Sequence, residues 1–296
     1  MTVTDDGGSS GRLRREFDVL PPGDIRNCLV ALSEDEALMS KLFQYRFASG
    51  RGLKGHSFGN LFLTALSNVT GDFTKAVRVS SEVLAIAGRI FPSTSSNVTL
   101  TAVLEDGTEV HGETSISKSR VPIREVRLHP RDAAPVPETL RAIAEADLIT
   151  LGPGSLFTSV IPNILVGGVA EAIRRSRAVK ACIVNLMWQP GETVGFTAAD
   201  HIDAILRHSR PGILDTVIVN TGGIDPALLR KYARQKARPV EADIARLRKL
   251  GLKIVAGDFV EQTAKVRHRP EALANAVLEL AARGRRLRNS LPRARG

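Results

Sequence analysis

The spacing of apolar residues changes twice along the chain and divides it into three parts. Up to about residue 88, apolar residues recur at helical spacing and are interrupted by turns rich in glycine and proline. Gly71 is placed to end one helix, and Asp72 is placed to cap the next. Residues 4–11 hold three glycines, two serines and two carboxylates. That composition predicts a loop there, rather than a helix or a strand.

The second part has the alternating pattern that is typical of strands. Apolar and polar residues alternate over residues 98–104. Asp106-Gly107 then predicts a tight hairpin, with residues 109–115 as the returning strand and a third strand close behind. We therefore predict an antiparallel β insertion over about residues 89–130.

From residue 137 onward, short apolar segments alternate with segments of helical spacing. The helix after the first of these strands is predicted near residues 163–176. Strands joined by helices through short links imply a parallel sheet covered on both faces. The predicted fold class is therefore α/β, a three-layer parallel sheet with a small antiparallel insertion. The predicted strands are 147–151, 179–186, 214–220 and 253–255.

The first predicted strand runs into a glycine turn. Gly152 and Gly154 allow a tight turn with an accessible backbone, and Ser155 and Thr158 lie where a helix begins. Free N–H groups and the helix dipole at such a junction favour an anion, so the turn is a candidate phosphate site. It matches neither a Walker loop nor a full dinucleotide fingerprint. A plain turn that requires glycines for its geometry is the alternative.

Polar residues also follow other predicted strands. Ligands of open α/β sheets bind beyond the carboxyl ends of the strands, so we expect these clusters to converge on one cleft. The clusters are Asp5, Asp6, Gly7, Gly8, Ser9 and Ser10 after a short strand at residues 2–4; Gly152 to Ser155; Asn185, Gln189 and Glu192; Asn220; and Asp258.

The chemistry of these clusters suits a phosphorylated, polyhydroxylated ligand. Carboxylates and amides bind sugar hydroxyls, whereas glycine N–H groups and serines bind phosphate. Asp5 and Asp6 are alternatively an Mg²⁺ site that bridges phosphates, or the caps of an Asx turn. His56 is a candidate base or phosphate donor, with helix capping as the alternative. We expect no tightly bound cofactor.

Composition limits the class of protein. Hydrophobic residues make up 43% of the 296, and only two cysteines occur, which fits a cytosolic protein with reduced core thiols. We expect neither a membrane span nor a signal peptide. The net charge of +10 includes a terminal run of arginines, and with few aromatic residues nucleic-acid binding is disfavoured. We expect one domain over residues 1–284 and a basic, disordered tail over 285–296.

Several motifs together resemble one family, and the similarity covers nearly the whole chain. The family is that of the gluconeogenesis factors (YvcK-like), the bacterial sister group of the 2-phospho-L-lactate transferases (CofD-like). The motifs are Asp5 to Arg14, Pro21 to Asn27, Gly55 to Asn60, Phe91 to Thr94, Leu151 to Ser159, Asn185 to Thr193, and Val266 to His268.

The resemblance implies a cytoplasmic, Rossmann-like protein that binds a uridine-diphosphate sugar such as UDP-N-acetylglucosamine. It implies a role in cell shape and envelope synthesis during growth on gluconeogenic carbon. We also expect a homo-oligomer. Residues Gly152 to Thr158, with Asn185, Gln189, Glu192 and Asn220, would line the nucleotide side. The second-substrate or metal side would hold Asp5, Asp6 and Asp24, with Arg26, Asn27, His56 and Asn60 as further candidates from the same motifs.

The chain departs from the family at its start. In the family, a first strand and a Gly-Gly-Gly-Thr-Gly loop precede the segment that matches Thr2 to Asp6. Here Met1 stands within what would be a strand. Loss of a central strand would open a gap in a densely packed core. We expect that the start codon is misassigned; a truncated protein that binds ligand poorly is the alternative.

Two functions stay open at this point. One is a regulator that binds a nucleotide sugar without turnover. The other is a Mg²⁺-dependent transferase that uses a donor linked to a nucleoside diphosphate. An NAD-dependent oxidoreductase is disfavoured, because the glycine fingerprint and its downstream acidic residue are missing.

Overall fold

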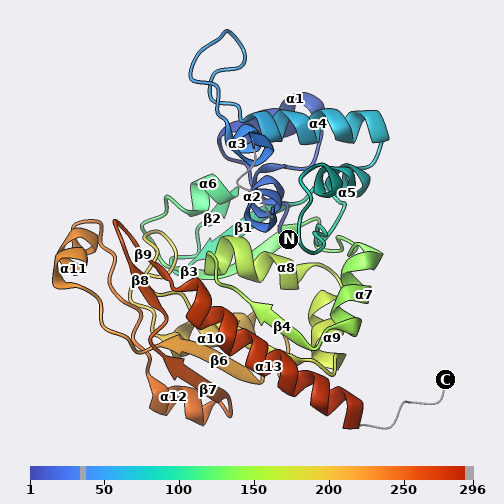
Figure 1. Ribbon diagram of the computed structural model, residues 1–296. Coiled ribbons are helices and arrows are strands. Elements are labelled where there is room, and N and C mark those ends of the chain that lie inside the picture. The colour runs from blue at the N-terminus through green and yellow to red at the C-terminus, as the bar shows by residue number, and fades with distance from the viewer. Residues whose placement is uncertain (34–37, 291–296) are drawn as a thin grey trace.

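The computed structural model describes residues 1–33 and 38–290. A four-stranded parallel sheet lies in the lower half of the molecule, as viewed in Figure 1. Its strands follow one another in chain order, so that β4 and β7 form the two edges. These strands are β4 (Leu148–Leu151), β5 (Val179–Ile183), β6 (Thr216–Asn220) and β7 (Lys253–Gly257). The predicted parallel α/β sheet is therefore confirmed.

Helices cover both faces of this sheet. The long helix α13 (Pro270–Ser290) crosses one face, and α10 (Ala198–Arg207) lies behind the other. Successive side chains of β5 point to opposite faces, as in any strand. Ala181 therefore packs with Leu280 of α13, while Cys182 joins the larger core on the α10 side.

The remaining elements after β6 surround the sheet edge. They are α11 (Pro226–Ala233), α12 (Ile244–Lys249) and the hairpin of β8 (Val260–Gln262) and β9 (Val266–His268).

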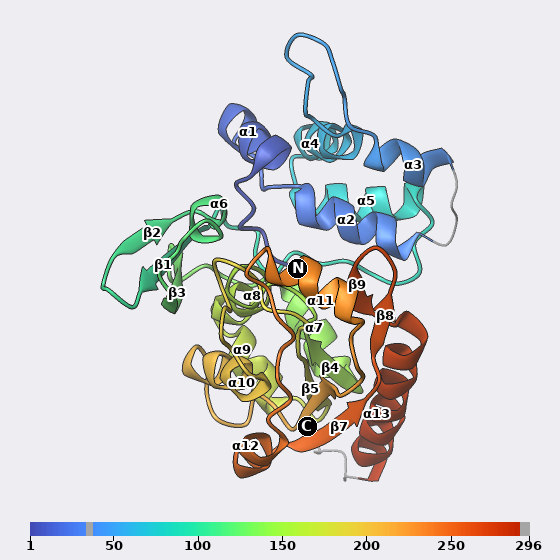
Figure 2. The ribbon, with the colours of Figure 1, turned by 90° about the vertical axis from the view of Figure 1, so that its left-hand side faces the viewer.

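The antiparallel insertion is also confirmed. β1 (Thr99–Leu104) lies between β2 (Glu109–His111) and β3 (Ile123–His129), and the sheet stands to one side of the parallel sheet in Figure 2. The returning strand is shorter than predicted. Gly112 has a φ of 85°, which ends β2, and the short helix α6 (Glu113–Ile116) follows.

A layer of helices formed by the first part of the chain covers the two sheets at the top of Figure 1. Side-chain caps begin two of them, as Ser57 accepts from Asn60 N and Asp72 accepts from Lys75 N. The helices are α1 (Gly8–Phe17), α2 (Gly23–Leu32), α3 (Leu38–Gln44), α4 (Phe58–Thr70) and α5 (Phe73–Val83).

The loop predicted for residues 4–11 is wrong in its second half, because α1 begins at Gly8. Gly11 lies so close to the Asp6 carbonyl that any side chain would clash there. The glycines thus allow tight packing of a helix start rather than a flexible loop. The short strand predicted at residues 2–4 is wrong, because these residues form no strand. Their neighbour Met1 donates from its terminal amine to the Phe91 carbonyl and accepts from Ser93 N at its own carbonyl.

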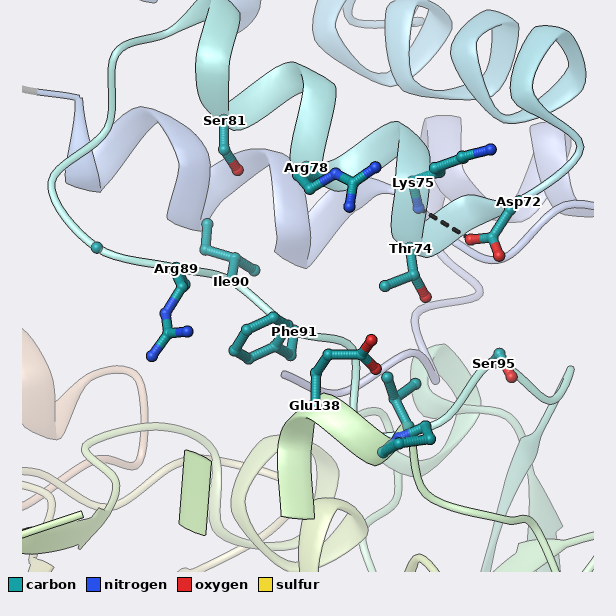
Figure 3. Close-up of a pocket in the computed structure, with 13 residues that line it drawn as sticks. Asp72, Thr74, Lys75, Arg78, Ser81, Arg89, Ile90, Phe91, Ser95 and Glu138 are labelled. Carbon is teal, nitrogen blue, oxygen red and sulfur yellow. Dashed lines mark hydrogen bonds between the residues drawn. The ribbon is translucent and has the colours of Figure 1, made fainter. Parts of the chain in front are cut away.

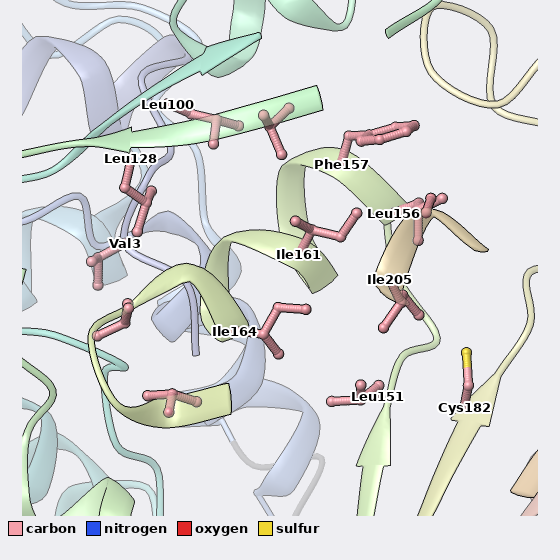
Figure 4. Close-up of a cluster of buried hydrophobic side chains, with 14 of the residues drawn as sticks. Val3, Leu100, Leu128, Leu151, Leu156, Phe157, Ile161, Ile164, Cys182 and Ile205 are labelled. Carbon is pink, nitrogen blue, oxygen red and sulfur yellow. The ribbon is translucent and has the colours of Figure 1, made fainter. Parts of the chain in front are cut away.

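The single helix predicted near 163–176 is instead two short helices, which a π-turn precedes. A π-turn, η1 (Leu156–Val160), leads into α8 (Ile161–Leu165), and α9 (Val169–Arg175) follows a break at Gly168, whose φ is 79°. α7 (Pro137–Glu145) precedes β4. In Figure 4, η1 and α8 lie between the antiparallel sheet, which carries Leu100 and Leu128, and the parallel strands, which carry Leu151 and Cys182. One hydrophobic core therefore connects the sheets through this segment.

The start of the predicted disordered tail is helical, because α13 continues to Ser290. Arg285 Nε lies 3.0 Å from one Asp147 carboxylate oxygen, and Arg288 Nη2 lies 2.8 Å from the other. These ion pairs attach the end of α13 to the segment before β4. The rest of the predicted tail, residues 291–296, lies outside the described residues.

Within the described ranges, no single helix is long and apolar enough to cross a membrane. Residues Leu156–Leu165 and Val169–Arg175 reach that length only as a pair, which is bent by 79°.

Candidate functional site

A cavity of about 470 Å³ joins the glycine turn to the start of α2. Gly152 and Gly154 line it from the sheet side, and Asp24 and Asn27 line it from α2. Its floor is apolar and is formed by Leu151, Ile164, Val169 and Ile173, with Ser159 and Asn163 as further polar residues. The tertiary structure thus brings the two glycines of the predicted nucleotide side and two residues of the predicted second-substrate side, Asp24 and Asn27, onto one cavity.

The glycine turn is packed tightly against the end of β5. Gly152 has a φ of 85°, and a Cβ there would lie 2.8 Å from the Ile183 carbonyl oxygen. Only glycine meets both requirements without strain. Gly154 differs, because its φ is not positive and the nearest atoms to a Cβ lie 3.6 Å and 3.7 Å away. The first glycine is required by the fold, whereas the second is not.

The amide side chains after β5 bond directly to this turn. Asn185 Nδ2 donates to the Gly154 carbonyl at 2.9 Å, and Asn185 Oδ1 accepts from Gly154 N at 3.3 Å. Gln189 Nε2 donates to Ser155 Oγ at 2.7 Å, while its Oε1 accepts from Asn185. Two predicted strand-end clusters therefore form one hydrogen-bonded unit.

The side chain of Glu192 binds the start of η1. Its carboxylate accepts from Phe157 N at 3.1 Å and from Thr158 Oγ1 at 3.0 Å, and its side chain is 6% exposed. Burial raises the pKa of Glu192, against the lowering effect of these hydrogen bonds. Phe157 N and Thr158 Oγ1, which lie in the predicted phosphate-binding turn, thus donate to the carboxylate of Glu192 instead.

The two aspartates of the first motif point in different directions. Asp5 Oδ1 accepts from Gly7 N at 2.9 Å, and its Oδ2 lies against Gly23 at the start of α2. Asp6 Oδ1 accepts from both the backbone N and the hydroxyl of Thr114, at 2.9 and 2.6 Å. Asp5 therefore faces α2, whereas Asp6 holds α6 of the β insertion.

These positions do not form a metal site by themselves. In the described part of the chain, no three His, Cys, Asp or Glu side chains are grouped so that they could hold a metal ion. Asp6 is already engaged by Thr114. Mg²⁺ binding at Asp5 and Asp6 stays a prediction, and it would require ligand phosphates to complete the coordination.

The start of α1 is held against the start of α4. Ser9 Oγ and His56 Nδ1 lie 3.0 Å apart, and Asn60 Nδ2 donates to Ser10 Oγ at 3.3 Å. Burial and Arg12 lower the pKa of His56, so its imidazole is neutral at pH 7. His56 thus has a structural contact in this state. Gly7 is the N-cap of α1, and Gly8 begins it with a φ of 43°.

Two polar groups beside this contact lack partners in the described part of the chain. They are Asn60 Oδ1 and Arg26 Nε, both buried. The Arg26 side chain lies against Gly59, where a Cβ would be 2.8 Å from its Cγ. Because buried polar groups are normally satisfied, this corner of the site retains unused hydrogen-bonding capacity.

Two carboxylates in this region, from distant segments of the chain, have raised pKa values. Burial, and secondly Asp5, raise the pKa of Asp24 to about 6. Burial, followed by Asp24 and Asp5, raise the pKa of Glu113 to about 8. Glu113 Oε2 accepts from Thr4 Oγ1 at 3.3 Å. A set of carboxylates with pKa values near neutrality is thus built around the aspartate loop.

Glu113 was missed by the sequence analysis. It lies in the β insertion, where the pattern predicted only a returning strand, and no motif marks it. Its nearest sequence signal is Gly112, which precedes it with a positive φ.

Most of the predicted strand-end residues do not line the cavity, among them Asp5, Asp6, Asn185, Gln189, Glu192, Asn220 and Asp258. Asn220 Oδ1 accepts from Phe259 N at 2.9 Å and from Gly222 N at 3.2 Å, so it fixes the loops after β6 and β7. Asp258 is paired with Arg269 at 3.0 Å. Both belong to the side of the sheet that is distant from β4. The convergence expected from the sequence is therefore limited to the clusters near β4 and β5.

Comparisons with known proteins give one consistent result. Residues 1–260 match the family described as 2-phospho-L-lactate transferase CofD. A gluconeogenesis factor of Halalkalibacterium halodurans is 48% identical over 280 residues, which cover 94% of this chain and 87% of that protein. The gluconeogenesis factor of Bacillus subtilis strain 168 is 46% identical over 281 residues, or 95% and 89% of the two chains. A crystal structure of a Bacillus halodurans protein has a TM-score of 0.91 at 48% identity, covering 94% of this chain and 89% of that one.

Proposed function

The chain belongs to the gluconeogenesis factor family of CofD-like proteins, and from this premise we propose that it binds a nucleotide sugar of the UDP-N-acetylglucosamine type. The cavity that joins the glycine turn to the start of α2 carries the proposal. We further propose that the protein is a cytoplasmic regulator of cell shape and envelope synthesis on gluconeogenic carbon, and that it forms a homo-oligomer.

The proposed ligand fits the distribution of polar groups around the cavity. The diphosphate is assigned to the cavity side of the glycine turn, where Gly154 has no side chain to fill the space. Sugar hydroxyls are assigned to Asp24 and Asn27 on the opposite wall, which offer acceptors and an amide donor. A volume of about 470 Å³ lies within the usual range for small-ligand sites.

A glycine substitution tests this assignment. Gly154→Ala has room in the free protein, because its Cβ would make only ordinary contacts, but it places a methyl group at the cavity wall. We expect unchanged unfolding and a loss of at least tenfold in affinity for UDP-N-acetylglucosamine, measured by calorimetric titration. Gly223→Ala is the matched control, since its Cβ would meet no atom within 4 Å and it lies outside the cavity.

Equal affinities in Gly154→Ala and the wild type would refute the placement of the diphosphate. A wild-type protein that binds none of the UDP-sugars, GDP or NAD would refute nucleotide binding as a whole.

A transferase is the second candidate, and it is favoured by one observation. Asp24 lies on the cavity wall with a pKa of about 6, which suits a group that accepts a proton from a substrate hydroxyl near neutral pH. The test is consumption of nucleoside-diphosphate-linked donors, assayed with and without Mg²⁺. Turnover that Asp24→Asn abolishes would support the transferase. No turnover with any donor would exclude the transferase and favour the regulator.

A further inference from the structure

A second cavity, of about 420 Å³, shares none of its lining residues with the cavity of the candidate site. α5 forms one wall, the start of α7 forms the other, and the linker between α5 and β1 lies between them. Figure 3 shows Arg78 on α5 and Glu138 on α7 on opposite sides, with Ile90 and Phe91 of the linker between the helices. None of these residues contributes to the glycine turn or to the aspartate loop.

The cavity is lined by three cationic side chains, Lys75, Arg78 and Arg89. In the described part of the chain, none of the three forms a salt bridge or a side-chain hydrogen bond. By contrast, Arg246 pairs with Asp200 and Asp203, and Arg269 pairs with Asp258. The cations around the cavity are therefore available to an anion from solution.

The start of α7 adds to this positive potential. Its N-cap is Val136, which has no side chain able to accept from the first N–H groups, and both Val136 and Pro137 line the cavity. Pro137 has no N–H, and the Thr139 N–H already donates to the Val136 carbonyl at 3.0 Å. The helix dipole is therefore what favours an anion at this position. The start of α5 differs, because Asp72 already caps it by accepting from Lys75 N at 2.9 Å.

The other lining residues suit a ligand that carries hydroxyl groups or a ring. The Arg89 guanidinium lies over the Phe91 ring, 5.7 Å from its centre, so a cationic and an apolar group adjoin each other at the cavity. Glu138 offers a carboxylate acceptor, and Thr74 and Ser95 offer hydroxyls. The size of the cavity is within the range of small-metabolite sites.

We propose that this cavity is a second ligand site, and that it binds a phosphomonoester of a hydroxylated small molecule, either a sugar phosphate or a nucleoside monophosphate. Arg78 and Arg89, with the N-terminus of α7, bind the phosphate. Glu138 accepts hydrogen bonds from hydroxyls of the ligand, and Phe91 packs against its ring. The site is separate from the proposed nucleotide-sugar cavity and does not depend on it.

Calorimetric titration of the full chain tests the proposal with four probes: glucose 6-phosphate, AMP, inorganic phosphate and glucose. We expect one of the two phosphomonoesters to bind, at least tenfold more tightly than inorganic phosphate, and glucose not to bind. AMP as the tighter probe identifies a nucleotide site with the base on Phe91. Glucose 6-phosphate as the tighter probe identifies a sugar-phosphate site.

Substitutions test whether the phosphomonoester binds in this cavity. Arg78→Gln combined with Arg89→Gln is expected to weaken the phosphomonoester at least tenfold. Arg248→Gln removes an exposed arginine of α12 and is expected to leave the affinity unchanged, as is Gly154→Ala in the other cavity. No binding of either phosphomonoester at millimolar concentration would overturn the proposal. Inorganic phosphate binding equally tightly, or equal losses in Arg248→Gln or Gly154→Ala, would overturn it as well.

Discussion

At the scale of single residues, the carboxylate of Glu113 makes the stability of the protein depend on pH. Its pKa is raised from 4.5 to about 8, so the folded protein holds this proton more tightly than the unfolded chain. Its contribution to stability is therefore complete below about pH 4.5 and is lost as the pH rises to about 8. Asp24 acts in the same direction over a lower window, from 3.8 to about 6.

Glu113→Gln is expected to remove much of this dependence. The amide cannot ionise, so the variant gains stability over the wild type as the pH rises, by about 2 kcal/mol above pH 8. Urea unfolding at pH 5 and pH 8.5 measures the difference. Glu105→Gln is the control, because Glu105 is an exposed carboxylate of the same β insertion. Parallel pH profiles for the wild type and Glu113→Gln would contradict the assignment.

At the same scale, Glu192 and Asp6 show that a predicted site residue can have a structural partner. Glu192 binds the start of η1, and Asp6 binds the start of α6. Both carboxylates accept two hydrogen bonds from the protein, which satisfies groups that water or a ligand would otherwise bind. Asp24, by contrast, lines the cavity, and its side chain is the better candidate for contact with a ligand.

At the scale of elements, close packing of α13 on the sheet depends on one glycine. Gly284 is buried within α13, and a Cβ there would collide with the backbone carbonyl of Asp147 just before β4. The same contact region holds the ion pairs of Asp147 with Arg285 and Arg288. The position of the helix over the sheet is thus fixed by backbone contact as well as by charge.

The sign of the change in stability on Gly284→Ala shows whether packing or helix propensity has the larger effect. Propensity alone would stabilise the helix by about 1 kcal/mol. We expect instead a loss of about 2 kcal/mol, because the clash is with backbone that cannot rotate away. The free energy of unfolding in urea decides between the two. A variant more stable than the wild type would show that α13 moves freely on the sheet.

At the scale of the whole molecule, one core links the helical layer to both sheets. The same cluster of buried residues includes Leu63 of α4, Leu100 of β1, Phe157 of η1 and Val217 of β6. Elements that share a continuous core lose their packing together. The helical layer is therefore not expected to unfold independently of the parallel sheet.

Two spectroscopic signals test this cooperativity. Trp188 is the single tryptophan of the chain, and its Nε1 donates to the Phe196 carbonyl on the sheet side. The far-ultraviolet circular dichroism signal comes mainly from helices, and the helices of the helical layer contribute to it. We expect the fluorescence and dichroism transitions in urea to coincide. Separate midpoints would show that the helical layer is an independent unit.

The local sequence was sufficient wherever neighbouring residues determine the structure. Asp72 caps α5 as predicted, and the Asp106-Gly107 hairpin is present. These signals depend on contacts between residues a few positions apart, so periodicity and turn chemistry record them. The prediction of one continuous helix failed at Gly168, where the helix breaks. The apolar pattern continues through this glycine, so the local sequence does not indicate the break.

What the sequence alone determined was the alternation of elements, the glycine turn and the membership of a family. Which strand-end clusters meet was decided only by the tertiary structure, because the stacking of layers brings together residues far apart in the chain. The contacts of Glu113 with Thr4, of Asp6 with Thr114 and of Glu192 with Thr158 span 109, 108 and 34 positions. No local pattern encodes such contacts, since they depend on how the β insertion, the helical layer and the parallel sheet pack against a shared core.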